Sequence, residues 1–537
     1  MASKLFQTKS PERLIEEAEA PERRMKRSLS AFDLTCLGIG AIIGAGIFSL
    51  VGSAAAGQVF SGKMQTPVSN FIIAWLNGSE VVLGRPGAGP ALVISFVVAA
   101  TACGFAALCY AELASMIPVS GSAYTYSYAT LGELIAWIIG WDLILEYAVG
   151  NMAVAVSWSS YFLKFLASIS NGAIKFPLWL VADPTTAQKI IAAGPDAAAA
   201  YSSTTLPVIA GHAISFNLPA ALIIVLLTIL LVYGVKESAR ANTTAVIIKI
   251  AVLVFFVSFG AFYLNPGHWH PFMPTGFSGV LTGAAIVFFA FIGFDAVSTC
   301  AEETRNPQRD LPIGLIASLA VCTLVYVLVG GVMTGLKVWS SYSGDAAPIA
   351  SAIAGLGKPW MEALISAGAL AGTTSVLLVF QLGQPRIFMA MARDGLLPKT
   401  FARVHPKFRT PHITTIVVGV VVGGVAMLKD IDTFADLTNI GTLFAFILVC
   451  LGVIALRRNA PNRPRPFRVP LVPFFPILGT IFCLVLMLSL PVETWIRFIV
   501  WLAIGLAIYF LYGVRHSELR RGHDTGDTEA DLPAIEP

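Results

Sequence analysis

The sequence predicts an all-α membrane protein with one polytopic domain. Three observations support this fold class. Of the 537 residues, 56% are hydrophobic and only 12% are charged, whereas soluble domains carry about 25% charged residues. Apolar runs of about 20 residues, the length of helix that crosses a bilayer core, recur from residue 32 to residue 514. These runs are apolar on every side, unlike the alternating strands of a membrane β-barrel.

Twelve apolar runs are long enough to be spans. Their approximate bounds are 32–55, 88–113, 133–163, 214–235, 242–265, 278–301, 312–336, 359–392, 411–428, 434–456, 471–490 and 494–514. The sequence therefore predicts a transmembrane domain over 32–514, with helices 1–5 in 32–265, helices 6–10 in 278–456 and helices 11–12 in 471–514. Residues 1–31 and 515–537 are the predicted cytosolic tails.

Lysines and arginines concentrate in alternate connections between these spans. With the N-terminus inside, 25 of them fall on the inner side and nine on the outer side. The positive-inside rule therefore places both termini in the cytosol. The compact tails favour a bacterial inner membrane. The net charge of +4 is too small to indicate binding of nucleic acid.

The sequence carries few features of an enzyme or a metal protein. Its seven cysteines have no CxxC spacing, so neither a disulfide framework nor a zinc site is expected. None of the seven histidines lies in the middle of a span, and GxSxG and HExxH motifs are absent. We therefore expect no enzymatic activity, no cofactor and no metal.

The first predicted span is unusually rich in glycine. Gly38–Phe48 contains four glycines in eleven residues. One interpretation is close helix packing, because Gly40 and Gly44 form a small-xxx-small pair. The other is an interrupted helix, in which Gly44–Gly46 unwind and backbone N–H groups face an anionic ligand group at the start of the next half-helix. A dinucleotide site is excluded, because the spacing is GxGxxxG and no βαβ unit surrounds it.

The sixth predicted span repeats this theme. Phe288–Asp295 places small residues and an acid within an aromatic run. Two interrupted helices at corresponding positions, in spans 1 and 6, are typical of an inverted repeat of five plus five helices with a binding site near the midplane. The alternative for the phenylalanines is ordinary packing in the core or against lipid.

Ionisable residues within spans are functional candidates, because burying a charge in hydrocarbon is costly. Glu146 lies midway along span 3, one turn beyond Asp142, and Lys249 lies about eight residues into span 5. Desolvation disfavours the charged form of a buried amine, so Lys249 is a candidate proton carrier. The alternative is a permanently charged Lys249, held by Glu146 or by carbonyl groups. Asp142 and Asp295 are weaker candidates.

With these features, the chain resembles the amino acid permeases of the amino acid-polyamine-organocation (APC) superfamily. Gly38–Phe48 is similar to the first-helix motif of that superfamily. The resemblance is closest to the cationic amino acid transporter branch and its bacterial members, and it covers roughly residues 25–515. Further similar stretches are Pro118–Tyr126, Phe289–Gly293, Glu302–Pro312, Arg386 and Arg393–Pro398.

The resemblance implies a LeuT-like fold, with two helices added to the five-plus-five repeat, and a secondary active transporter that works by alternating access. The substrate carboxylate would meet the backbone N–H groups of Gly44, Ala45 and Gly46. Ala45 departs from the family pattern, in which many members have Ser or Thr, so a hydroxyl contact would be absent. The substrate ammonium would meet the backbone carbonyls of Ile42, Phe289, Ala290 and Ile292.

The resemblance also implies proton symport. Lys249 matches a helix-5 lysine of proton-coupled members, and Glu146 matches an acid on helix 3. Phe380 stands where cationic members tend to have a small residue, and a bulky apolar ring favours small neutral L-amino acids. A uniporter or exchanger for arginine, lysine or ornithine is the main alternative, and a non-transporting nutrient receptor is another.

The expected partners are therefore the amino acid, protons and membrane lipid. The sequence offers no cysteine suited to bridging a heavy-chain subunit, so no covalent partner is expected, whereas a small single-helix partner stays open.

Overall fold

The computed structural model describes residues 5–10, 12, 14, 16, 27–58, 62–119, 122–192, 194–209, 211–233, 239–405, 407, 408 and 410–520. Residues 521–537 of the predicted C-terminal tail, and most of residues 1–26 of the predicted N-terminal tail, lie outside these ranges.

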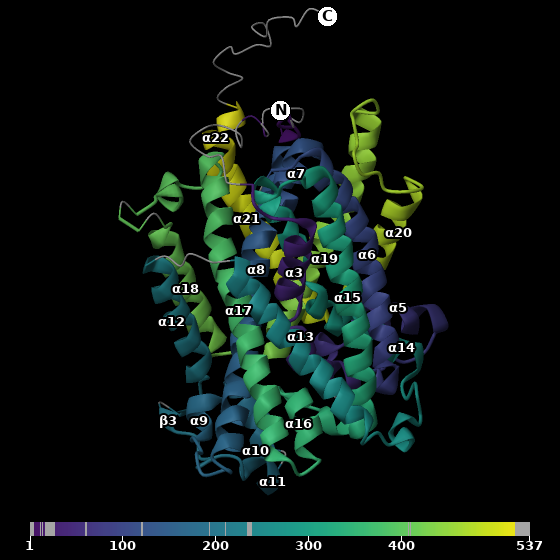
Figure 1. The fold of residues 1–537 in the computed structure, drawn as a ribbon, viewed down its shortest axis with the longest axis vertical. Helices are drawn as coiled ribbons and strands as arrows, with labels where there is room; N and C mark the ends of the chain where they lie inside the picture. The colour runs from purple at the N-terminus through teal and green to yellow at the C-terminus, as the bar shows by residue number, and fades with distance from the viewer. Residues whose placement is uncertain are drawn as a thin grey trace, which may run out of the picture.

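Long helices that run roughly along one axis build the molecule (Figure 1). The helices of eight or more residues are α3 (Ala31–Ile42), α5 (Val68–Asn77), α6 (Leu92–Met116), α7 (Ser122–Thr130), α8 (Glu133–Ile169), α10 (Pro184–Ala192), α12 (Leu218–Tyr233), α13 (Ala239–Ala261), α14 (Gly276–Val287), η6 (Phe294–Glu303), α15 (Pro307–Leu336), α17 (Pro359–Arg393), α18 (His412–Ala426), α19 (Ile431–Asn459), α20 (Phe474–Leu488) and α21 (Val492–Ile508).

Short elements connect these helices. Four two-residue strands form two antiparallel pairs, β1 (Gly57–Gln58) with β2 (Arg85–Pro86) and β3 (Val208–Ile209) with β4 (His212–Ala213). The remaining short helices include α4 (Val51–Ala56), α9 (Leu178–Val181), α11 (Pro195–Ala198), α16 (Pro348–Ala354) and α22 (Val514–His516). The regular secondary structure of the described residues is therefore helical apart from these minimal hairpins, as expected for an all-α membrane protein.

Within the described ranges, eight helices are long and apolar enough to cross a membrane, or nine if the bent pair in the first span is counted as one crossing. Three of the twelve predicted spans coincide instead with shorter apolar helices, α12, α18 and α20. These three have 16, 15 and 15 residues, short of the roughly 20 that a straight crossing needs. The count of twelve spans therefore stays a prediction.

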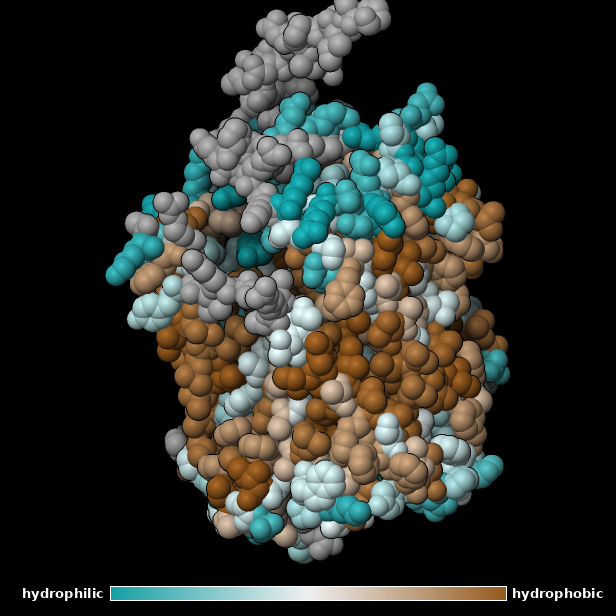
Figure 2. Space-filling view, viewed as in Figure 1, coloured by the Kyte–Doolittle hydropathy of each residue, from teal (hydrophilic) through white to brown (hydrophobic). Residues whose placement is uncertain are grey.

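On the face of the molecule seen in Figure 2, a belt of apolar side chains lies between two more polar ends. Large exposed apolar side chains supply the belt, among them Leu226 and Ile229 of α12 and Val420 of α18. Since a soluble protein rarely exposes a contiguous apolar surface of this kind, the belt is the lipid-facing surface of an integral membrane protein.

The described parts of both tails meet at the start of α8. The backbone N–H of Glu133 donates to the carbonyl of Gln7 at 3.0 Å. The buried carboxylate of Glu133 accepts hydrogen bonds from Ser517 and from Tyr509, the latter at 2.8 Å, and forms an ion pair with Arg520 at 2.9 Å. The two ends of the chain therefore lie on the same side of the helix bundle.

A buried ion pair joins two segments at the opposite end. The guanidinium of Arg85, from β2, donates two hydrogen bonds of 2.8 and 2.6 Å to the carboxylate of Asp436 on α19. Nearby, Lys189 of α10 pairs with Asp430 at 3.0 Å. Burial alone would raise the pKa of the Asp430 carboxyl, but Lys189 and Thr433 hold this pKa below its ordinary value. These pairs tie β2 and α10 to the start of α19.

Removing one partner of the buried pair should destabilise the protein. We expect Arg85→Met to cost about 3–5 kcal/mol, because it leaves the Asp436 carboxylate buried without its counter-ion. The double variant Arg85→Met/Asp436→Leu should recover most of that loss. Thermal unfolding of the detergent-purified protein measures both effects. Lys189→Met is the matched control, and at this partly exposed pair it should cost about 1 kcal/mol or less. Equal losses for the single and the double variant would contradict the interpretation.

Candidate functional site

The first span is interrupted at Ile43 and Gly44. α3 ends at Ile42, Ile43 has an extended backbone with φ −74° and ψ 100°, and the chain then resumes in a π-helical turn over Gly46–Leu50. The two halves of the span are bent by 41°. In the described part of the chain the amides of Gly44 and Ala45 donate no hydrogen bond. A helix start with unused N–H groups is suited to an anionic ligand group.

The sixth span is interrupted at Ile292 and Gly293. α14 tightens into a 3₁₀ turn over Phe288–Phe291, and η6 begins at Phe294. Gly293 has φ +106°, a backbone conformation that side chains other than glycine rarely adopt. The predicted interruptions of helices 1 and 6 are therefore both present.

The two interruptions pack directly against each other. A Cβ atom at Gly46 would lie 2.2 Å from the Cα of Ala290. A Cβ atom at Gly44 would lie 2.9 Å from Val376 on α17. Both values are well below ordinary contact, so these glycines let the backbones of the two broken helices approach each other and α17.

A tyrosine that the sequence did not single out bridges both interruptions. The hydroxyl of Tyr326, on α15, lies 3.0 Å from the carbonyl of Ile42 and 2.9 Å from that of Ala290. Since a hydroxyl carries one proton, it donates to one carbonyl at a time. The sequence analysis considered only ionisable residues within spans as candidates for a functional buried contact. The hydroxyl of a tyrosine in the middle of a span is a comparable signal.

The carbonyls expected to meet a substrate ammonium are therefore partly engaged. Ile42 and Ala290 contact Tyr326, and the Phe289 carbonyl accepts from the Ile292 amide at 3.3 Å. A carbonyl oxygen has a second lone pair, so each of these groups keeps an acceptor site. The four residues whose carbonyls are predicted to meet the ammonium are all buried beside the two interruptions, namely Ile42, Phe289, Ala290 and Ile292.

Lys249 reaches the first broken helix from α13. Its side chain is fully buried, and its Nζ donates a hydrogen bond of 2.6 Å to the carbonyl of Gly40, three residues before the interruption. No ion pair joins Lys249 to an acid among the described residues. Of the two partners considered for a permanently charged lysine, the structure therefore shows a carbonyl group and not Glu146.

Glu146 lies in a separate acidic cluster. Its carboxyl is within hydrogen-bonding reach of Thr442 on α19, and it interacts electrostatically with Asp142 and Asp295. Both carboxylate oxygens of Asp142 are buried and have no hydrogen-bond partner in the part of the chain that the structure describes. The two predicted proton-coupling residues thus lie in different surroundings, Lys249 against α3 and the Glu146 cluster between α8, α19 and η6.

Phe380 packs on α8, with its ring centroid 5.4 Å from that of Tyr147. It stands one turn beyond Val376, the residue that faces Gly44, so it lies about 6 Å further along α17. Gln381 donates to Thr228 on α12, and Gln384 donates to the Ile144 carbonyl on α8. Of these three side chains, Phe380 is the one suited to limit a ligand pocket beside the interruptions.

These features define a multi-pass membrane permease with a backbone-lined site at two interrupted helices. The family model for amino acid permeases matches residues 29–509. The chain therefore belongs to the amino acid permease family, within the APC superfamily, as its motifs predicted.

Curated relatives agree with this assignment. The chain is 46% identical to the branched-chain amino acid permease BcaP of Bacillus subtilis, over 97% of this chain and all of the relative. It is 43% identical, with the same coverage, to the methylthioribose transporter of Bacillus subtilis. It is 35% identical to the vacuolar cationic amino acid transporter 4 of Arabidopsis thaliana, over 82% of this chain and 64% of the relative. All three are named as permeases or transporters and none as an enzyme.

Adding one methyl group at the helix crossing should disrupt the site. Gly46→Ala places a carbon 2.2 Å from the Ala290 backbone, so the broken helices must separate. We expect a loss of about 1–3 kcal/mol from overpacking and loss of transport. Thermal unfolding and uptake into proteoliposomes measure the two effects. Gly424→Ala, in α18 with nothing within 4 Å, is the matched control and should be neutral. Full transport by Gly46→Ala would show that the close approach is not required.

Proposed function

We propose that this protein imports small neutral L-amino acids by alternating access, as a proton symporter with a LeuT-like fold. This fold comprises a five-plus-five inverted repeat and two further helices, twelve spans in all, within residues 32–514. The observation that carries the proposal is the contact between the Lys249 ammonium and the Gly40 carbonyl, just before the interruption of the first span. It joins a buried titratable group to the proposed substrate site.

The proposed binding mode uses backbone groups at both interruptions. The substrate carboxylate accepts from the unused amides of Gly44 and Ala45 and from the amide of Gly46, at the positive end of the following half-helix. The substrate ammonium donates to carbonyls of Ile42, Phe289, Ala290 and Ile292. Since these groups recognise the part that all amino acids share, selectivity is left to the side-chain pocket.

The proposed coupling follows from the same contact. A protonated Lys249 holds α3 through the Gly40 carbonyl, and a neutral amine holds it less strongly, since hydrogen bonds from charged donors are the stronger ones. Protonation thereby favours one position of α3, and loss of the proton favours its release. A proton gradient can drive transport only through such a difference between two conformations. Glu146 is the second proposed proton-coupling residue.

Phe380 supports the preference for small neutral substrates. Its ring fills space beside Tyr147 and offers no acceptor to a cationic side chain. The similarity to a branched-chain amino acid permease also supports a neutral aliphatic substrate. Because another relative is named a methylthioribose transporter, methylthioribose belongs in any substrate panel.

A uniporter or exchanger for cationic amino acids is a second candidate. It is favoured by the buried carboxyls of Asp142 and Glu146 near Asp295, which could attract a cationic side chain, and by relatives named cationic amino acid transporters. A non-transporting receptor with the same fold would bind amino acid without flux.

The proposed location is the bacterial inner membrane, with both termini in the cytosol. The cation distribution and the Bacillus relatives support it, and the two tails meet at one end of the bundle. The proposed partners are the amino acid, protons and membrane lipid, without nucleic acid or a covalent subunit.

The coupling proposal is tested with Lys249→Met in proteoliposomes. We expect the wild type to accumulate alanine when the pH outside is lower than inside, and the variant to lose this accumulation while it still exchanges internal for external alanine. Radiolabel uptake, with and without the gradient, measures both activities.

The exposed Lys429→Met is the matched control and should behave as the wild type. Accumulation by Lys249→Met that still follows the gradient would exclude Lys249 as the coupling residue. Uptake of arginine in preference to alanine would favour the cationic alternative. Binding of alanine without any flux would identify a receptor.

The pocket proposal is tested with Phe380→Leu. Because a smaller side chain lengthens the pocket, we expect uptake of leucine relative to alanine to rise roughly ten-fold, the effect of about one methylene group. Competition between the two labelled substrates gives this ratio. Phe388→Leu, on the same helix but packed on Phe401, is the control. An unchanged ratio in Phe380→Leu would place Phe380 outside the pocket.

A further inference from the structure

A groove lies on the outer surface of the bundle, beside α15. It opens between the first turns of α15 and the connection that precedes α20. Thr304, which forms an isolated β-bridge with Leu29, lies just before α15 in the chain. Its volume is about 630 Å³, and a second hollow of about 320 Å³ adjoins it at Ile316 and reaches α6. The groove is distinct from the proposed substrate site, which lies inside the bundle.

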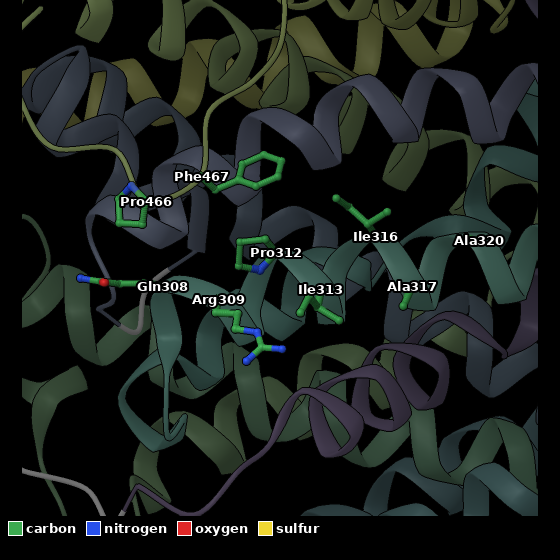
Figure 3. A pocket seen from close by; sticks show the side chains of 9 residues that line it. All are labelled: Gln308, Arg309, Pro312, Ile313, Ile316, Ala317, Ala320, Pro466 and Phe467. Atoms are coloured by element: carbon green, nitrogen blue, oxygen red, sulfur yellow. The ribbon is translucent and has the colours of Figure 1, made fainter.

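One end of the groove is polar and positively charged. Figure 3 shows Gln308 and Arg309 at this end, with Pro466 and Phe467 opposite them. Arg309 is exposed, and its side chain forms no ion pair within the described residues. Arg468, next to Phe467 in the chain, is exposed as well. Among the described residues, this end therefore presents a cation without a counter-ion.

The rest of the groove is apolar and incompletely filled. Ile313, Ile316, Ala317 and Ala320 form one stripe of α15 (Figure 3), spaced as residues on one helix face are. Gly104 of α6 lines the adjoining hollow, and a Cβ atom there would meet nothing within 4 Å. Small residues thus leave a channel that runs from the charged end into the apolar belt.

The charge and shape of the groove favour a lipid. It is an open strip with a cation at one end and apolar side chains along the rest, which matches a charged headgroup joined to acyl chains. A flexible acyl chain is narrow enough to follow the stripe. The charged end selects the headgroup, because arginines near a membrane surface attract anionic lipids.

We propose that this groove is a binding site for an anionic glycerophospholipid of the leaflet that faces the cytosol. The phosphate lies on Arg309, and one acyl chain runs along Ile313 and Ala317 toward Gly104. This proposal also gives a role to Arg309 within the Glu302–Pro312 stretch, which the proposed transport site does not use.

Bound lipid would act on the transport machinery through α15. This helix carries Tyr326, whose hydroxyl contacts both interrupted helices. A lipid wedged against the outer face of α15 would therefore stabilise the helix on which the substrate site depends.

Native mass spectrometry of the detergent-purified full-length protein tests the site. Phosphatidylglycerol and phosphatidylcholine with identical chains are the probes. We expect the wild type to retain phosphatidylglycerol in preference to phosphatidylcholine. Arg309→Gln should weaken phosphatidylglycerol binding about five-fold, the effect of one arginine near an anionic surface. Ala317→Phe, which fills the groove, should weaken binding of both lipids.

Two matched variants separate the groove from the general surface. Arg403→Gln removes another exposed arginine, between α17 and α18, and Leu324→Phe enlarges an exposed apolar side chain of α15 outside the groove. Both should bind lipid as the wild type does. Wild-type binding by Arg309→Gln and Ala317→Phe would overturn the proposal. Equal loss in the control variants, or a co-purifying polypeptide in place of lipid, would overturn it too.

Discussion

The crossing of two interrupted helices at Gly46 and Ala290 is the constraint on which the rest of the structure depends. At this crossing a Cβ atom on Gly46 would lie 2.2 Å from the Cα of Ala290, and each helix is interrupted within three residues of the contact. The freed amides and carbonyls would be costly inside a membrane, where no bulk water can satisfy them. The fold must therefore supply partners for these groups. The proposed substrate, with one carboxylate and one ammonium group, matches the amides and carbonyls that the protein does not itself satisfy.

Buried side chains complete this arrangement from neighbouring helices. Tyr326 contacts a carbonyl of each broken helix, and Lys249 donates to the Gly40 carbonyl of the first. Both side chains contact backbone carbonyls that would accept a hydrogen bond within the helix if the helix were unbroken. Lys249 contacts α3 alone, whereas Tyr326 contacts both α3 and η5 (Phe288–Phe291). A change at either contact therefore bears directly on the proposed site.

Much of the fold was predictable because the bilayer imposes a simple rule on sequence. Apolar runs of sufficient length must become helices, so each predicted span coincides with an apolar helix, and the glycines at Gly44 and Gly293 marked both interruptions. The number of crossings was harder to predict. Composition does not distinguish a short crossing, at which the bilayer thins locally, from a helix that stays within one leaflet. With 16, 15 and 15 residues, α12, α18 and α20 are open to both interpretations.

The sequence by itself determined the class of protein, the two interruptions and the chemical type of the buried groups, since these follow from local composition and from motifs. Only the tertiary structure decided which groups meet. It placed Lys249 on the Gly40 carbonyl and Glu146 with Asp142 and Asp295, turned Gln381 toward α12, and brought Tyr326 to both interruptions. These contacts join residues far apart in the chain, and which of them form depends on how the helices pack, which no local pattern specifies.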